Sequence, residues 1–275
     1  ADVIVVADSN NWKVGVPSLT TSLRGVVTAE FTVRTLDHAL HSGMYGGPVL
    51  DAVTCAARLV ATLHDADGAV AVRGLASYDD ATAEYAEEDL RADTGLLDGV
   101  RLTGRGSIAS RLWTQPSLTV IGMDVTSTAE ASNTLIPACT VRLSLRVAPG
   151  QDPGEAAQAL VRHLEENAPF GARVEASVEE TGPAFKAAGD SPAASAGRWA
   201  LARAWGRPPV DIGVGGSIPF IADLHDAFPE ADILVTGVED PDTRAHSQNE
   251  SLHLGDWRNA ILAEALLLSR LAGQA

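Results

Sequence analysis

Two kinds of hydrophobic pattern divide the chain. Val3–Ala7 is apolar at every position, which is typical of a central parallel strand covered by helices on both faces, and it ends at Asp8. From Val27 to Val33 apolar and polar residues alternate, which predicts a strand with one solvated face. The sequence therefore predicts both a parallel α/β sheet and an antiparallel sheet.

Helix and strand signals continue along the rest of the chain. Proline in a first turn, Ser or Asp caps and apolar periodicity mark the helices, and short alternating or apolar runs mark the strands. The predicted helices are Pro48–Leu63, Ala81–Arg91, Asp152–Ala168, Ser191–Trp205, one after Ser217, and Trp257–Leu271. The further predicted strands are Leu118–Val125, Thr140–Val147, Arg173–Val178 and Ile233–Val235.

The two ends of the chain have the same parallel α/β texture, and the middle has a helix-on-sheet texture. We therefore expect residues 1–22 and 188–275 to form one α/β domain, interrupted by an inserted α+β domain over residues 23–187. The chain opens without Met on a strand that is already apolar, so we expect it to start within a fold.

Composition narrows the class of partner. The net charge is −16, which disfavours nucleic acid and anionic lipid because both are bound through clustered Lys and Arg. No apolar run is long enough for a membrane span. Cys55 and Cys139 lie in apolar runs and predict two buried thiols, which fits a reducing cytoplasm.

Asp8 and His246 are the first candidates for chemistry. Each follows a predicted buried strand, and ligands bind beyond the carboxyl ends of strands in open α/β sheets. A carboxylate and an imidazole both suit zinc. Alone, Asp8 equally fits a turn cap and His246 an ordinary surface histidine, so the pair suggests a metal site without fixing it.

Three further segments carry polar chemistry. His41 lies in a Gly-rich stretch, His41–Pro48, that fits either an ordinary turn or close approach of another chain or ligand. Arg146 lies on the polar face of its strand, either solvated or ready to bind a carboxylate bidentately. Gly215–Pro219 precedes a helix and is either a plain turn or a site for an anion.

A series of motifs resembles the carnosinase and cytosolic non-specific dipeptidase branch of the dinuclear-zinc metallopeptidases, which is related to aminoacylases and zinc carboxypeptidases. Their order and spacing match throughout the chain. The motifs are Asp8–Trp12, Leu23–Gly25, His41–Gly47, Trp113–Leu118, Asn133–Pro137, Leu145–Pro149, Gly215–Pro219 and Ala245–Glu250.

The resemblance implies a catalytic α/β domain, 1–22 with 188–275, and an inserted lid, 23–187, through which two subunits form a homodimer. It implies two divalent metal ions, zinc with manganese or cobalt as alternatives, to which Asp8 and His246 are ligands. His41 resembles the lid histidine that crosses to the partner's active site and stabilises the oxyanion. The residues that resemble substrate-binding positions are Arg146, Thr134, Asn133, Gly216 and Ser217.

The chain departs from this family in one large respect. We find no His-x-Asp, bridging Asp or Glu-Glu pair of the kind that supplies the family's other ligands and general base. A catalytic zinc needs about three protein ligands, so we expect this chain to be a C-terminal portion that lacks the N-terminal metal-binding segment, and to be inactive alone.

The resemblance implies hydrolysis of dipeptides or similar small amides by metal-activated water. One alternative is an N-acyl-amino-acid amidohydrolase or carboxypeptidase of the same clan. The other is a non-catalytic dimerisation module.

Overall fold

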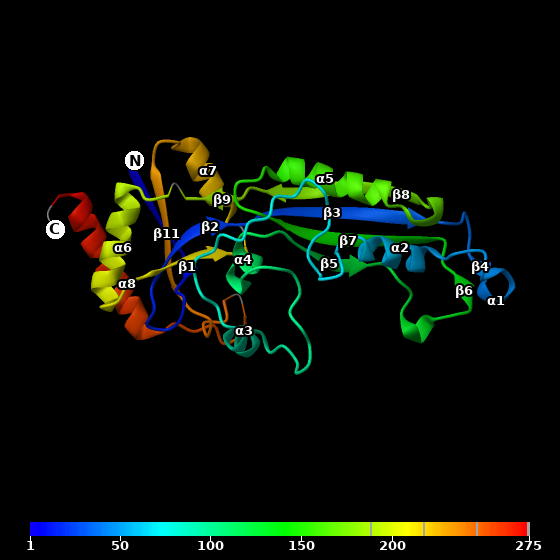
Figure 1. The fold of residues 1–275 in the computed structure, drawn as a ribbon, viewed down its shortest axis with the longest axis horizontal. Helices are drawn as coiled ribbons and strands as arrows, with labels where there is room; N and C mark the ends of the chain where they lie inside the picture. Colours follow the sequence, from blue (N-terminus) through cyan, green and yellow to red (C-terminus); the bar gives the residue numbers. More distant parts are fainter. Residues whose placement is uncertain (188, 217, 246, 274–275) are drawn as a thin grey trace.

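A five-stranded, a four-stranded and a two-stranded sheet follow one another along an elongated molecule (Figure 1). This computed structural model describes residues 1–187, 189–216, 218–245 and 247–273. In that part of the chain, no helix has the combination of length and hydropathy that crossing a lipid bilayer requires.

The five-stranded sheet is built from both ends of the chain. Its order is β1-β11-β2-β10, with β9 paired to β2. Strand β1 runs parallel to β11, whereas β2 is antiparallel to β11 and parallel to β10. The strands are β1 Val3–Asn10, β2 Ser18–Leu23, β9 Phe185–Lys186, β10 Val210–Val214 and β11 Asp232–Glu239.

Helices cover both faces of this sheet. Val3 and Val5 pack in the cluster that includes residues of α6 (Pro192–Trp205) and α8 (Leu254–Leu271). Ile4 and Val6 pack in the cluster that includes residues of α7, Pro219–Ala227. The prediction of a parallel strand with two apolar faces is confirmed, although β1 stands at the end of the strand order and not at its centre.

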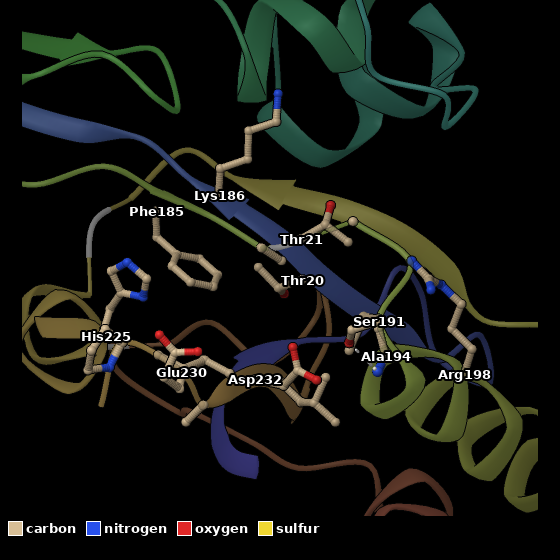
Figure 2. A pocket seen from close by; sticks show the side chains of 17 residues that line it. Thr20, Thr21, Phe185, Lys186, Ser191, Ala194, Arg198, His225, Glu230 and Asp232 are labelled. Atoms are coloured by element: carbon tan, nitrogen blue, oxygen red, sulfur yellow. Dashed lines mark hydrogen bonds between the residues drawn. The ribbon is translucent and has the colours of Figure 1, made fainter. Parts of the chain in front are cut away.

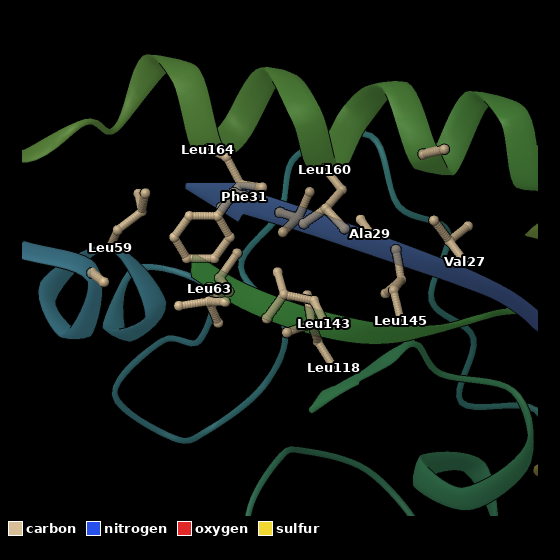
Figure 3. Packing of buried hydrophobic residues seen from close by; sticks show 14 of the residues in the cluster. Val27, Ala29, Phe31, Leu59, Leu63, Leu118, Leu143, Leu145, Leu160 and Leu164 are labelled. Carbon is tan, nitrogen blue, oxygen red and sulfur yellow. The ribbon is translucent and has the colours of Figure 1, made fainter. Parts of the chain in front are cut away.

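The four-stranded sheet is antiparallel, with the order β5-β7-β3-β8. Two helices, α2 (Ala52–Ala61) and α5 (Pro153–Glu166), pack on the apolar side of its alternating strands. Figure 3 shows Phe31 of β3 and Leu143 of β7 meeting Leu160 and Leu164 of α5 in this core. The strands are β3 Gly25–Arg34, β5 Ser117–Met123, β7 Ala138–Val147 and β8 Arg173–Gly182.

The two-stranded sheet forms the far tip of the molecule (Figure 1). Strand β4 (Leu40–His41) pairs with β6 (Thr134–Leu135), and the short helix α1 (Ser42–Tyr45) follows β4 directly. A 3₁₀ turn, Thr128–Glu130, precedes β6, and a second, Pro169–Gly171, connects α5 to β8.

Two predicted helices begin later than expected. The helix predicted from Pro48 starts at Ala52, because the side chain of Asp51 accepts the Thr54 N–H at 2.9 Å and caps the helix there. The helix predicted over Ala81–Arg91 is α3, Glu87–Thr94, whose acidic first turn suits the positive end of a helix.

The segment between the two main parts also folds against both. Helix α4 (Ile108–Trp113) follows α3, and Trp113 packs edge-to-face on Trp12 at 5.7 Å between ring centroids. Tyr85 also packs edge-to-face on Trp12, with 5.1 Å between ring centroids. This aromatic cluster attaches the 78–113 segment beside the end of β1.

Candidate functional site

Asp8 occupies a β-bulge. The strand predicted to end at Ala7 continues to Asn10, and its register with β11 passes from Ala7 opposite Thr236 to Ser9 opposite Gly237. Asp8 is therefore the extra residue, and its side chain is exposed. Bulges turn a side chain away from the regular alternation and recur beside active sites, so this carboxylate is presented at the sheet end.

Gly237 is required by that bulge. A Cβ at position 237 would overlap the carbonyl of Ser9, which lies against the glycine backbone. The bulge at Asp8 therefore requires a residue without a side chain at position 237.

The loop after β11 starts at the same end of the sheet as Asp8. The Asn11 N–H donates to the Glu239 carbonyl at 2.6 Å, which holds the two strand ends together. In the loop, Asp240 and Thr243 are buried, and the Ser251 N–H donates to the Thr243 carbonyl at 3.0 Å. The candidate ligand His246 belongs to this loop but lies outside the described residues, so its position relative to Asp8 stays a prediction.

The described residues do not by themselves fit a metal ion. Across residues 1–187, 189–216, 218–245 and 247–273, no group of three or more His, Cys, Asp or Glu side chains stands close enough to ligate one. Asp8 supplies a single carboxylate.

Arg146 lies near the junction of the two main sheets, beside a second arginine. In the register of the four-stranded sheet it stands opposite Val26 and Ser117. Arg24, which immediately precedes β3, donates from Nη1 to the Ser117 Oγ at 3.1 Å. Arg24 and Arg146 are close enough for the charge of Arg146 to act on the Arg24 guanidinium.

Arg24 is buried, with 8% of its surface exposed. Burial, together with the smaller effect of the positive charge of Arg146, lowers the pKa of its guanidinium to about 10. Arg24 remains cationic at neutral pH. Among the described residues, neither Arg24 nor Arg146 forms an ion pair with an acidic side chain.

The glycine turn before α7 contacts Arg24 directly. The Arg24 Nε–H donates to the Gly215 carbonyl at 3.3 Å, and a Cβ at 215 would stand 2.6 Å from Nη2. Gly216 follows with open space around it, since a Cβ there would meet only Val214 at 3.9 Å. Ser217, the other predicted substrate-binding residue of this turn, lies outside the described residues.

His41, Asn133 and Thr134 come together at the tip. His41 is paired with Thr134 between β4 and β6, and the Asn133 carbonyl accepts the Ser42 N–H at 2.9 Å. His41 is exposed, and its Nδ1 accepts the Gly43 N–H at 3.1 Å. In the neutral imidazole the proton therefore resides on Nε2, which leaves a donor facing outward.

The tip and Asp8 are at opposite regions of the elongated chain (Figure 1). Within one chain, His41 and Thr134 therefore do not share a site with Asp8, whereas Arg146 and Gly216 both lie next to Arg24 near the junction of the sheets.

A separate cavity of about 210 Å³ lies between β2, β9, α6 and the start of β11. Figure 2 shows Phe185 and His225 on one side of it, Arg198 on the other, and the carboxylates of Glu230 and Asp232 below. It sits at the start of β11, whereas Asp8 stands near that strand's carboxyl end. We therefore do not assign this cavity to the chemistry of Asp8.

Arg24 is the residue that sequence reasoning missed. Its local sequence, Leu23-Arg24-Gly25, was noted only as part of a motif. The sequence around it gave no signal of burial, because the residues before it, Thr20-Thr21-Ser22, are polar and charged residues are seldom buried.

Comparison with known families agrees with this arrangement. A model of a peptidase dimerisation domain, that of the M20 peptidases, matches residues 21–172. The cysteinylglycine-S-conjugate dipeptidase of Corynebacterium striatum is 34% identical over 276 residues, which cover 98% of this chain and 60% of that protein. The Cys-Gly metallodipeptidase of Saccharomyces cerevisiae is 26% identical, over 97% of this chain and 58% of that protein.

Solved structures show the same fold. The yeast dipeptidase Dug1p superimposes with a TM-score of 0.74 at 22% identity, over 98% of this chain and 58% of that one. An M20 family metallo-carboxypeptidase from Sulfolobus solfataricus gives 0.75 at 21% identity, over 98% and 63%. The chain thus spans about six tenths of the length of these relatives.

Proposed function

The chain belongs to the M20 metallopeptidases, and from this premise we propose that it is part of a metal-dependent dipeptidase. The single observation that carries the proposal is the match of nearly the whole chain to a dipeptidase at 34% identity. Two features of the structure agree with such an activity. Asp8 is exposed at its bulge, and Arg24 and Arg146 place two positive charges near each other.

The two proposed domains correspond to the two main sheets. Residues 1–22 and 188–275 form the catalytic α/β domain, and residues 23–187 form the lid. Support comes from strand pairing, since β1 and β11 join the two ends of the chain while β3, β5, β7 and β8 pair among themselves. At the end of the lid range, β9 already pairs with β2 of the five-stranded sheet.

Arg146 is proposed to bind the carboxylate of the substrate. Arg24 lies between Arg146 and the glycine turn, where Gly216 and Ser217 would contact the same end of the substrate through the backbone before α7. A free carboxylate would supply an anionic partner for Arg146, which forms no ion pair with a described acidic side chain. This favours small peptides with a free C-terminus.

His41 is proposed to act on the partner subunit. Its outward Nε2–H would donate to the carbonyl oxygen of a bound peptide and stabilise the oxyanion that forms there. Thr134 and Asn133 accompany it at the tip and would line the same partner site.

Two divalent ions, zinc or else manganese or cobalt, are proposed with Asp8 and His246 as one ligand each. The remaining ligands would come from outside this chain, as the relatives extend beyond the region that it matches. When bound, such ions lower the pKa of water and so supply the nucleophile.

The homodimer is proposed to form through the lid, along the β5 edge of the four-stranded sheet. That edge exposes Val120 and Ile121, whereas the opposite edge strand, β8, carries Arg173, Glu175 and Glu179. Charged side chains on an edge discourage pairing, so β5 is the edge that suits a second copy. The buried, unpaired Cys55 and Cys139 suit a reducing cytoplasm.

The test is hydrolysis by the protein expressed from its complete reading frame. With added Zn²⁺ or Mn²⁺ it should cleave Cys-Gly in preference to N-acetylmethionine and to longer peptides. Preference for the N-acetylated amino acid would indicate an amidohydrolase, and preference for longer peptides a carboxypeptidase. No zinc in the purified protein and no hydrolysis after metal addition would leave only a dimerisation module.

A further inference from the structure

Arg24 connects the two main sheets through three hydrogen bonds. Besides its bonds to the Gly215 carbonyl at 3.3 Å and the Ser117 Oγ at 3.1 Å, Nη1 donates to the Gln115 carbonyl at 3.3 Å. Gly215 follows β10 of the five-stranded sheet, whereas Ser117 begins β5 of the four-stranded sheet. One buried side chain therefore holds both parts.

Its backbone forms a further link between the same parts. The Arg24 N–H donates to the Val214 carbonyl at 3.2 Å, and the next residue begins β3. A side chain at Gly215 would collide with the guanidinium, so the turn approaches Arg24 as closely as a backbone can.

The groups held by Arg24 are those that flank the proposed carboxylate site. Ser117 stands opposite Arg146 in the sheet, and Gly215 is bonded in sequence to Gly216. A shift of Arg24 would therefore change the separation between Arg146 and the glycine turn.

We propose that Arg24 is a positioning residue for substrate recognition: it holds Arg146 and the Gly215–Gly216 turn at the separation that a peptide's C-terminal carboxylate spans. This inference rests on the proposed dipeptidase function. Arg24 acts through Arg146 and the turn, and its own charge adds to the potential that attracts the carboxylate.

The test compares Cys-Gly with its C-terminal amide, using the protein from its complete reading frame. Arg24→Lys keeps the charge but cannot reach all three acceptors, of Gly215, Gln115 and Ser117, at once. We expect KM for Cys-Gly to rise about ten- to hundredfold, with kcat changed far less, because hydrogen bonds of charged groups have that magnitude. KM for the amide should change less than threefold.

Two milder variants guard against misfolding of Arg24→Lys. Ser117→Ala removes one partner without burying an unpaired charge, and Gly215→Ala displaces the guanidinium from the turn. Both should raise KM for Cys-Gly and spare the amide, with circular dichroism spectra like the wild type.

Arg111→Lys is the matched control. Arg111 also donates to backbone carbonyls, those of Thr103 and Gly106, but these lie within the 78–113 segment and not between the sheets. It should leave the ratio of the two KM values unchanged.

Equal losses on Cys-Gly and its amide in all three variants would assign Arg24 a merely structural role and overturn the inference, while the proposed function stands. Wild-type protein that hydrolyses neither compound refutes the proposed function and this inference with it.

Discussion

At the scale of single residues, His41 and Asp256 each have two side-chain atoms that can form hydrogen bonds, and they differ in whether one of these atoms remains free. The imidazole of His41 uses Nδ1 for the Gly43 N–H, so only Nε2 is free for chemistry. The carboxylate of Asp256 uses both oxygens for structure, one on the Trp205 Nε1–H and one on the Gly15 N–H, each at 2.8 Å. The first residue suits catalysis and the second suits stability.

Replacing His41 with Ala should lower kcat for Cys-Gly by about 10²–10³, because one donor to the oxyanion is lost. Metal content, measured by atomic absorption, should stay at the wild-type level. His38→Ala is the control, since His38 is exposed on the same segment and pairs with Asp37. Unchanged turnover in His41→Ala would refute the role given to this imidazole.

Replacing Asp256 with Ala should destabilise the fold by about 2–5 kcal/mol, because two half-buried N–H groups lose their acceptor. Asp256 itself is buried, with 1% of its surface exposed. Urea denaturation followed by tryptophan fluorescence measures the change, with the exposed Asp98→Ala as control. A loss below about 1 kcal/mol would mean that Trp205 and Gly15 find other acceptors.

At the scale of elements, helix α8 places a carboxyl group, that of Glu264, in its contact with strand β11. Glu264 is half-buried on this helix and accepts the Thr236 Oγ–H of β11 at 3.3 Å. Burial raises the pKa of this carboxyl, with the Thr236 bond opposing the shift. The ionised form is thus disfavoured in the folded state, so stability is lost as the pH rises from the ordinary carboxyl range through the raised pKa.

Glu264→Gln should therefore raise the thermal midpoint at pH 7, and the gain should vanish at about pH 4 and below, where the wild-type carboxyl is protonated in both states. Thermal unfolding across this pH range measures it. The exposed Glu84→Gln is the control. An equal gain at pH 4 and pH 7 would exclude ionisation as its cause.

Helices and strands whose own sequence carries a cap or an apolar periodicity could be predicted. Strands that are buried by neighbouring strands, with no such pattern of their own, could not. Helix α6 begins after the Ser191 cap and ends at Trp205 as expected, and β3 covers the predicted alternation. Strand β2 was missed because Thr20, Thr21 and Ser22 look like a polar loop. Two of them, Thr20 and Ser22, are buried only because β10 and β11 flank the strand.

The candidate site shows the same limit. Asp8 was identified from its place after an apolar run, but its bulge depends on Gly237, over two hundred residues away in the chain. Arg24 was missed because its acceptors come from β5 and the glycine turn, which no local pattern links. His41 and Thr134 lie side by side because β4 pairs with β6, and no local pattern in the sequence indicates that pairing.

At the scale of the whole molecule, the two edges of the four-stranded sheet differ in character. Ile121→Lys on β5 should convert the proposed dimer to monomer in sedimentation velocity, because it places a charge on the apolar edge. Val178→Lys on β8 is the matched control and should leave the mass unchanged. A dimer that survives Ile121→Lys would move the interface elsewhere on the lid.

The separation of the tip that carries His41 (β4) from the strand that carries Asp8 (β1) predicts that two different mutants can complement each other (Figure 1). In the proposed dimer each active site uses Asp8 of one chain and His41 of the other, so the inactive variants His41→Ala and Asp8→Ala should complement each other. In their mixed dimer one active site lacks both residues and the other has both, so this dimer should have about half the wild-type rate.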